Sequence, residues 1–278
     1  MLSVVIPVFN EIDTLAQVLV AVSKALPGVA KEIIVVNDGS SDGTRDWIQA
    51  HIPDGCASSA RLPLRERMAS DCEQATYPAN VTVRAFHHTH TLGKGASLKT
   101  GLAHVSGEVV VLQDADLEYD PQDWTSMYDL VAVHKTAQVV YGSRFLGRRE
   151  GRAHFISWSQ AGGNWLISAL FRVLYRRGLS DVEVCYKMFT RQVSDTLNIT
   201  CTDFGCEIQI SAQIARSDWV IAEVAVGYRG RSRAEGKKIG WRDGFRALWY
   251  LVRFRAGSTL SHPQQPLSHQ SLGQREVR

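Results

Sequence analysis

Short apolar runs rich in valine and isoleucine alternate along this chain with segments whose apolar residues recur at helical spacing. Runs of this kind suit strands that are buried on both faces, and their alternation with helices is the pattern of a parallel sheet. We therefore expect an α/β fold with a mostly parallel central sheet and helices on both faces. Strands are expected at 2–8, 32–37, 81–85, 108–113 and 138–141, and helices at 12–26, 44–51, 95–103 and 122–134.

The composition is that of an ordinary globular protein. With 278 residues, 45% of them hydrophobic, the chain is long enough to bury a large core within one domain. A formal net charge of only +3 argues against a nucleic-acid partner bound through a global basic field. Five scattered cysteines lack the paired spacing of a zinc site and indicate reduced thiols in a cytoplasmic protein. They are Cys56, Cys72, Cys185, Cys201 and Cys206.

We expect any membrane contact to be peripheral. The run 2–8 lacks a basic leader and is interrupted by Pro7, so we interpret it as a first strand rather than a signal segment. No run reaches the roughly 20 apolar residues of a spanning helix. The stretches 155–177 and 241–255 carry tryptophans at helical spacing beside arginines, which suits either core helices or amphipathic helices on an anionic membrane surface. We expect at least one of them to lie on the bilayer.

The boundaries follow from shifts in composition. We expect a single domain over 1–255, with a peripheral insertion at 53–80, where glycine, serine, proline and mixed charges show no sustained period. Residues 256–278 are rich in serine, histidine, proline and glutamine and are expected to form a disordered tail. Nothing in the sequence indicates an oligomeric state.

Polar motifs follow three of the expected strands. They read PVFNE at 7–11, NDGSSDGT at 37–44 and DADLE at 114–118. Each alone is common turn chemistry, but ligands bind beyond the carboxyl ends of parallel strands, so the series predicts one site. Asp114 and Asp116, one residue apart, suit Mg²⁺ or Mn²⁺, which combine carboxylate ligands with substrate phosphates. A diphosphate substrate is therefore indicated.

With these motifs the chain resembles the family-2 glycosyltransferases of the GT-A fold, and among them the polyprenyl- and dolichyl-phosphate sugar synthases. The resemblance covers roughly 2–255 apart from 53–80. It implies a GT-A fold with C-terminal amphipathic helices, and an inverting, metal-dependent hexosyltransferase. Further matching motifs are LGKGA at 92–96, YGSRFLG at 141–147, DVEVCYK at 181–187 and EGKKIGW at 235–241.

The resemblance also implies roles for individual residues. The base and ribose of a nucleoside diphosphate sugar are expected at Pro7, Phe9, Asn10, Glu11, Val36 and Asp38. The diphosphate and a Mg²⁺ or Mn²⁺ ion are expected at Asp114, Ala115, Asp116 and Glu118, with the three acids as metal ligands. The basic residues that face phosphates of the donor or acceptor are Arg144, Arg231 and Lys238. Asp116 and Arg144 are the expected catalytic residues.

The acceptor is expected to be a lipid phosphate. A phosphate is already an anion near neutral pH, whereas a hydroxyl needs a general base. The chain has no Glu-Asp dipeptide and no Gln-x-x-Arg-Trp, features that resemble the base and product-binding motif of polysaccharide-synthesising relatives. We expect transfer of glucose from UDP-glucose, or of mannose from GDP-mannose, to polyprenyl or dolichyl phosphate at the cytoplasmic face of the membrane. Two alternatives stay open: transfer to a hydroxyl of a glycan, lipid or small metabolite, and a sugar-nucleotide-binding protein without turnover.

For several side chains the sequence supports a structural role as well as a functional one. Lys94, between two glycines, either shapes a loop near the diphosphate or caps the following helix. Asp181 and Glu183 either position the acceptor or brace a loop, and we favour bracing. The histidines 87, 88 and 90 lack partners at ligand spacing, so we interpret them as exposed loop residues rather than a metal site.

Overall fold

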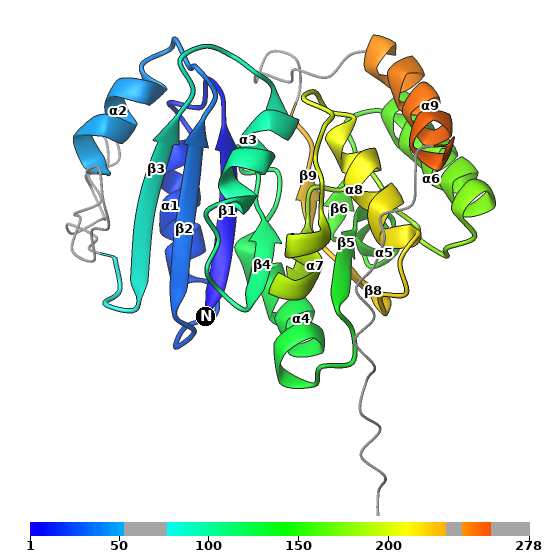
Figure 1. The fold of residues 1–278 in the computed structure, drawn as a ribbon, viewed down its shortest axis with the longest axis horizontal. Helices are drawn as coiled ribbons and strands as arrows, with labels where there is room; N and C mark the ends of the chain where they lie inside the picture. Colours follow the sequence, from blue (N-terminus) through cyan, green and yellow to red (C-terminus); the bar gives the residue numbers. More distant parts are fainter. Residues whose placement is uncertain (53–76, 232–240, 257–278) are drawn as a thin grey trace, which may run out of the picture.

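The computed structural model describes residues 1–52, 77–231 and 241–256 (Figure 1). A seven-stranded sheet runs through it in the order β3-β2-β1-β4-β7-β5-β8. Every pairing is parallel except those of β7, which runs antiparallel to both β4 and β5. The strands are β1 (Leu2–Val8), β2 (Lys31–Asn37), β3 (Val81–His87), β4 (Val109–Leu112), β5 (Val139–Ser143), β7 (Lys187–Thr190) and β8 (Ile221–Ala225).

Helices cover both faces of this sheet, as Figure 1 shows for α1 on one side and α3 and α8 on the other. The helices are α1 (Leu15–Lys24), α2 (Thr44–His51), α3 (Lys94–Leu102), α4 (Trp124–Tyr128), α5 (Arg144–Arg149), α6 (Trp158–Tyr175), α7 (Arg191–Thr196), α8 (Cys206–Ala215) and α9 (Trp241–Ala256). A second, two-stranded sheet joins β6 (Ala153–His154) in parallel to β9 (Tyr228–Arg229). The expected fold class is thus confirmed.

The five expected strands are confirmed, and the apolar runs of the central ones are buried on both faces. All seven residues of β2 are buried, as are all four of β4. Fully burying a valine or isoleucine side chain contributes about 1.5–3 kcal/mol, so these central strands supply much of the core. They also fix where the polar motifs lie, because each motif begins where its strand leaves the core.

Three expected helices differ in their bounds, α3 by one residue at each end. Residues 12–14 form a turn, and α1 begins at Leu15, just after Thr14, whose carbonyl oxygen accepts the peptide NH of Val18 (3.0 Å). The helix expected at 122–134 is divided into a 3-10 turn (Pro121–Asp123), α4 and a π-helical turn (Asp129–Val133).

The domain over 1–255, the insertion at 53–80 and the tail at 256–278 stay predictions. Most of the insertion, and all of the tail after Ala256, lie outside the described residues. Lys238 lies outside them too.

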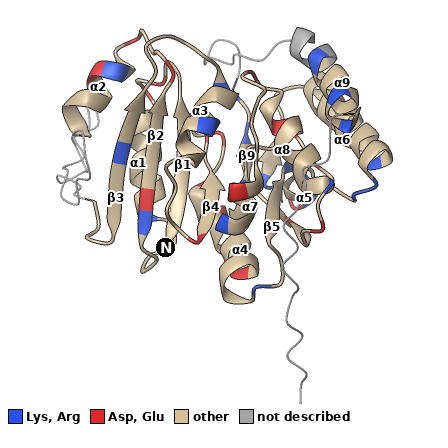
Figure 2. Ribbon diagram, viewed as in Figure 1, with Lys and Arg blue, Asp and Glu red and all other residues tan. Residues whose placement is uncertain are grey.

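Helices α6 and α9 confirm that the two tryptophan-bearing stretches are helical. They pack side by side, and the Tyr175 hydroxyl of α6 donates to the carbonyl oxygen of Leu251 in α9 (2.9 Å). Figure 2 places several arginines on α9 and at the end of α6. Among the helices that the structure describes, none has both the length and the apolar composition that crossing a membrane requires.

The glycines of the LGKGA motif permit a close approach between α3 and a distant loop. Gly93, at φ +104°, immediately precedes α3, and the peptide NH of Gly95 donates to the carbonyl oxygen of Thr202 (2.8 Å). A Cβ atom at Gly95 would lie 1.9 Å from the carbonyl oxygen of Cys201. The motif therefore holds the 201–206 loop against α3.

We predict that Gly95→Ala lowers the free energy of unfolding by roughly 2–4 kcal/mol, because two backbones must separate to admit the methyl group. Urea denaturation followed by circular dichroism measures this. Gly163→Ala is the matched control, since a Cβ atom there meets nothing within 4 Å. In the middle of α6 it should raise stability by about 0.5–1 kcal/mol. Equal behaviour of the two variants would contradict the close approach.

Candidate active site

The first two strand-end motifs form one surface. The peptide NH of Asn10 donates to Ser40 Oγ (2.9 Å), and the peptide NH of Ser41 donates to Asn10 Oδ1 (2.9 Å). Glu11 adds a third link through its peptide NH to Thr44 Oγ1 (3.0 Å). Asn10 has a φ of 52°, a left-handed conformation that asparagine tolerates better than most residues. The residues expected to hold a nucleotide therefore meet at one edge of the sheet.

Asp38 secures the loop that leads into α3. Its carboxylate accepts the peptide NH groups of Leu92 (2.9 Å) and Gly93 (2.8 Å) and contacts His88 Nδ1 at 2.7 Å. The other ring nitrogen of His88 lies 3.0 Å from Thr100 Oγ1. The expectation that His88 is an exposed loop residue is wrong, because these two partners draw its ring into the fold.

The remaining nucleotide-binding candidates differ in exposure. Pro7 and Phe9 are partly exposed at the end of β1. Val36 is fully buried, and its side chain lies where it would contact a Cβ atom at Gly101 of α3. Only Pro7 and Phe9 can present a side-chain surface to a ligand, whereas Val36 packs against α3.

Asp114 is held by a chain of alternating charges. Lys94, the first residue of α3, places Nζ 2.7 Å from Asp114 Oδ1 and 3.0 Å from Glu207 Oε1 in α8. The other oxygen of Glu207 pairs with the ammonium group of Lys187, which is fully buried. Although burial opposes ionisation, the Lys94 ammonium holds the pKa of Asp114 below its ordinary value. The sequence suggested that Lys94 shapes a loop or caps α3. In the structure its ammonium group pairs with Asp114 and Glu207 as well.

Asp116 faces a second cation. Arg231 Nη2 lies 3.3 Å from Asp116 Oδ2, while the same guanidinium binds both carboxylate oxygens of Glu11 at 3.0 Å. The peptide NH of Arg231 donates to Glu118 Oε1 (2.6 Å). Burial, followed by the negative charges of Asp114 and Glu118, raises the pKa of Asp116 to about 7. The structure therefore brings Glu11, Asp116, Glu118 and Arg231 together, as the sequence predicted.

The donors around the DADLE motif have the chemistry of a divalent-cation site. Among the described residues, no three histidine, cysteine, aspartate or glutamate side chains converge as a ready-made cage. Asp114 and Asp116 nevertheless offer carboxylate oxygens at the end of one strand, and their crowded negative charge is what raises the pKa of Asp116 after burial. Hard oxygen donors and negative charge that Lys94 and Arg231 compensate only in part fit Mg²⁺ or Mn²⁺ completed by substrate phosphates. Glu118 is the weakest of the three candidates because its carboxylate accepts the Arg231 peptide NH.

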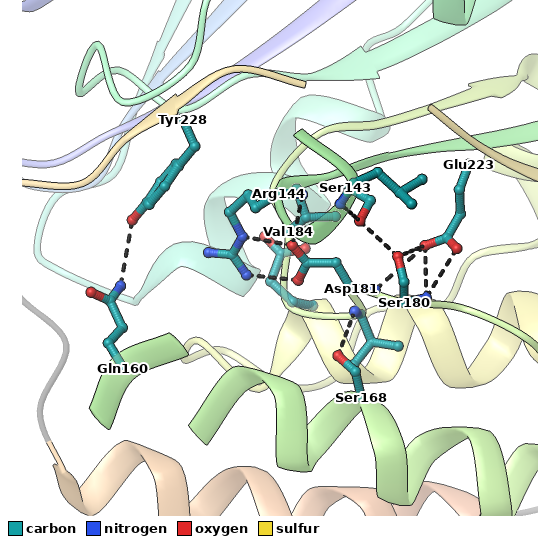
Figure 3. Close-up of polar contacts among 12 residues, drawn as sticks. Ser143, Arg144, Gln160, Ser168, Ser180, Asp181, Val184, Glu223 and Tyr228 are labelled. Atoms are coloured by element: carbon teal, nitrogen blue, oxygen red, sulfur yellow. Dashed lines mark hydrogen bonds and ion pairs between the residues drawn. The ribbon is translucent and has the colours of Figure 1, made fainter. Parts of the chain in front are cut away.

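Arg144 is fixed on the other side of the site (Figure 3). Its Nε and Nη2 atoms donate to the two carboxylate oxygens of Asp181 at 2.7 and 2.8 Å. The rings of Tyr228 and Phe155 lie 5.2 and 5.7 Å from the centre of its guanidinium group. Asp181 is fully buried, so it braces Arg144 rather than meeting a substrate. Glu223 supports the same loop by accepting the peptide NH of Ser180 (2.8 Å).

Glu183 is a partly buried carboxylate for which the sequence favoured only a bracing role. With the amide of Asn164 oriented to suit its neighbours, its nitrogen donates to Glu183 Oε2 (2.9 Å) and its oxygen accepts from Arg144 Nη2 (3.2 Å). Burial raises the pKa of Glu183 to about 7, with Asp181 and Glu207 adding to the effect and Arg144 opposing it. A carboxylate with a pKa near neutrality beside a fixed arginine is a candidate for proton transfer or acceptor binding.

Comparison with known proteins identifies the family. Residues 3–197 match the model of Glycosyl transferase family 2. The chain therefore belongs to glycosyl transferase family 2 and is a glycosyltransferase with a GT-A fold.

Two relatives act on undecaprenyl phosphate according to their names. The undecaprenyl-phosphate mannosyltransferase of Micrococcus luteus is 26% identical over 272 residues, which cover 91% of this chain and 98% of that protein. The undecaprenyl-phosphate 4-deoxy-4-formamido-L-arabinose transferase of Salmonella choleraesuis is 25% identical over 214 residues. That match covers 76% of this chain but only 55% of the relative.

A solved structure with the same fold is glucosyl-3-phosphoglycerate synthase from Mycobacterium tuberculosis, in complex with Mn²⁺, UDP and phosphoglyceric acid. It superposes with a TM-score of 0.62 at 18% identity, covering 92% of this chain and 78% of that one.

We predict that Glu183→Gln makes stability less dependent on pH. The folded protein keeps a proton on Glu183 up to about pH 7, whereas the unfolded chain releases it near the ordinary glutamate value of 4.5. Stability therefore falls as the pH rises between these two values, and the amide variant escapes this loss. From about pH 5 to about pH 8 the variant should gain on the order of 2–3 kcal/mol over the unsubstituted protein.

Thermal denaturation of ligand-free protein at a series of pH values measures the difference. Glu108→Gln, at an exposed carboxylate, is the control and should show no such gain. If the stability difference between the Glu183 variant and the unsubstituted protein stays constant across pH, the raised pKa of Glu183 is contradicted.

Proposed function

We propose that this enzyme transfers a hexose from a nucleoside diphosphate sugar to a polyprenyl phosphate, with a divalent metal ion and with inversion at the sugar C1 atom. The proposal rests above all on one observation: Asp114 and Asp116 stand between two fixed cations, Lys94 and Arg231, at the end of a central strand. The names of the two undecaprenyl-phosphate relatives support the acceptor, and the Mn²⁺ and UDP named for the solved structure support the donor.

The donor half of the reaction needs positive charge where a diphosphate departs. Breaking the bond from the sugar C1 atom to the diphosphate builds negative charge on the leaving group, which prearranged cations stabilise as it develops. Arg231 and Lys94 are such cations, since their carboxylate partners hold them at the edge of the sheet. Asp114 and Asp116 would hold Mg²⁺ or Mn²⁺, which supplies further charge stabilisation to a diphosphate.

The acceptor half needs a group that attracts an anion. A lipid phosphate needs no general base, and the positive charge of a guanidinium group attracts a phosphate. Arg144 is held in one orientation by Asp181 and by two aromatic rings, so it is ready to orient such an acceptor.

Transfer to a hydroxyl acceptor is the second candidate, and Glu183 favours it. A carboxylate whose pKa is raised to about 7 can accept a proton from a hydroxyl at the operating pH. The solved structure with the same fold is named for an acceptor of this kind, phosphoglyceric acid.

The decisive experiment offers both acceptors. The purified protein is incubated with Mn²⁺ or Mg²⁺, a panel of nucleotide sugars including UDP-glucose and GDP-mannose, and either polyprenyl phosphate or phosphoglyceric acid, and products are identified by mass. A glycosylated polyprenyl phosphate supports the proposal. Transfer to the hydroxyl acceptor alone refutes it.

We predict that Asp116→Ala lowers the rate of transfer on the order of 10³-fold or more, because it removes a metal ligand and a partner of Arg231. Its melting temperature should stay level or rise, since the substitution relieves crowding among buried carboxylates. Asp195→Ala, which removes an exposed aspartate paired with Arg191, is the control and should retain full activity. Persistent transfer by the Asp116 variant would remove the metal role from this residue.

We predict that Glu183→Gln separates the two candidate functions. With a phosphate acceptor kcat should change by only a few-fold, because no proton has to leave the nucleophile. If a hydroxyl is the true acceptor, kcat should fall about 10²–10⁴-fold, the usual contribution of a general base. Steady-state kinetics with the acceptor found in the product screen gives the answer.

A further inference from the structure

A basic hollow lies between α5 and α6, apart from the strand-end site. It encloses about 410 Å³ and is lined by Phe145, Arg148, Arg149, Trp165, Arg172 and Ser180. Arg148 and Arg149 come from the last turn of α5, and Arg172 comes from the last turn of α6. Three arginines from two helices thus line one hollow.

The charge of these arginines is not compensated within the described part of the chain. None of the three has a carboxylate within 4.0 Å there, and Arg172 reaches only the carbonyl oxygen of Leu179, at 3.4 Å. Arg148 lies over the ring of Trp158 at 4.4 Å, a contact that orients the guanidinium without neutralising it. Arginines gathered without carboxylates have the composition of a site for a phosphate group, which guanidinium binds through paired hydrogen bonds.

Beside the hollow, α6 exposes an apolar face. Trp158 is 80% exposed, Trp165 55% and Val173 75%, and Leu166 and Leu170 are exposed on the same side. At 100° per residue these positions lie opposite the buried ones, such as Ile167 and Phe171, so α6 is apolar on both faces. Trp165 belongs to both features, since it lines the hollow and stands on the exposed face.

We propose that this surface docks onto an anionic phospholipid bilayer, with the phosphate headgroup of one lipid in the hollow between Arg148, Arg149 and Arg172. Charge complementarity selects the occupant: a cationic hollow adjoins an exposed tryptophan-bearing face, and a phospholipid presents a phosphate directly above its acyl chains. A soluble phosphate would use the arginines but leave the apolar face uncovered. The inference deepens the proposed function, because it places the enzyme at the membrane that carries a lipid-linked acceptor.

The test measures membrane binding without donor or acceptor, so it is independent of whether sugar transfer occurs. The full-length chain is floated on density gradients with vesicles of phosphatidylcholine alone, or of phosphatidylcholine mixed with phosphatidylglycerol. The triple variant R148Q/R149Q/R172Q removes the three positive charges that line the hollow. Its matched control, K24Q/K99Q/K135Q, removes the same charge from exposed lysines on other elements.

We expect the unsubstituted protein and the control to bind the anionic vesicles, and the hollow variant to bind on the order of a hundredfold more weakly, since each basic side chain near an anionic surface contributes about a factor of five. Trp165→Ser should weaken binding to the same vesicles while leaving the arginines in place. Circular dichroism and melting temperature establish that each variant is folded.

Equal binding by the hollow variant and the unsubstituted protein would overturn the inference, as would an equal loss in the lysine control, which would indicate a general charge effect. Tight binding of inorganic phosphate in solution without vesicle binding would also overturn it, as would self-association that covers α6 instead. Vesicle binding through the hollow by a protein that fails to glycosylate polyprenyl phosphate would refute the proposed function and leave this inference standing.

Discussion

The arrangement of the loops around the site depends on two carboxylates that are crowded together at the end of a buried strand. Asp114 and Asp116 leave β4 where the core ends, and burial works against the ionisation of both. Two unit charges 4–8 Å apart repel by about 2–4 kcal/mol at the effective dielectric constant near a protein surface. Lys94 outweighs it at Asp114, whose pKa is lowered, whereas Arg231 offsets it only in part at Asp116, whose pKa stays raised. The motif therefore requires both cations beside it.

These two cations come from distant parts of the chain, and holding them fixes the loops around the site. Lys94 begins α3, and the loop before it is held by Asp38, while α8 supplies Glu207 as its second partner. Arg231 follows β9, where the peptide NH of Arg229 donates to the carbonyl oxygen of Glu118 (2.9 Å). The small β6-β9 sheet therefore positions Arg231, and its residues Ala153 and Tyr228 are buried in the core. In this way the charge balance of the DADLE motif determines where α3 and the segment that carries Arg231 lie.

The sequence predicted the parts of the fold that depend on local pattern. The apolar runs of β1, β2 and β4 and the helical period of α2 were sufficient because burial on both faces leaves a continuous signal. Strand β7 was missed because its four residues, KMFT, include a lysine whose charge is balanced only by Glu207 in the tertiary structure. The pairing of Lys94 with Asp114, and the burial of Glu183 beside Asn164, could not be predicted either, since each joins residues without any periodic relation in sequence. Most of the expected nucleotide and metal residues do converge, because parallel strands deliver their ends to one edge.

Helix α6 joins the acceptor side of the site to the exposed apolar surface. On its inner face, Asn164 contacts Glu183 and Arg144, and Ser168 Oγ accepts the peptide NH of Val182 (3.2 Å). On its outer face lie Trp165 and Leu166, one and two residues beyond Asn164. A helix with its side chains is about 10–12 Å across, so a surface resting on the outer face stands within about one helix diameter of Arg144. An acceptor whose phosphate lies at a membrane surface could therefore reach Arg144 across the width of α6. A freely diffusing metabolite, by contrast, gives no reason for the outer face of α6 to be apolar. The same helix thus relates the choice of acceptor to the docking surface, and the two proposals draw on opposite faces of one element.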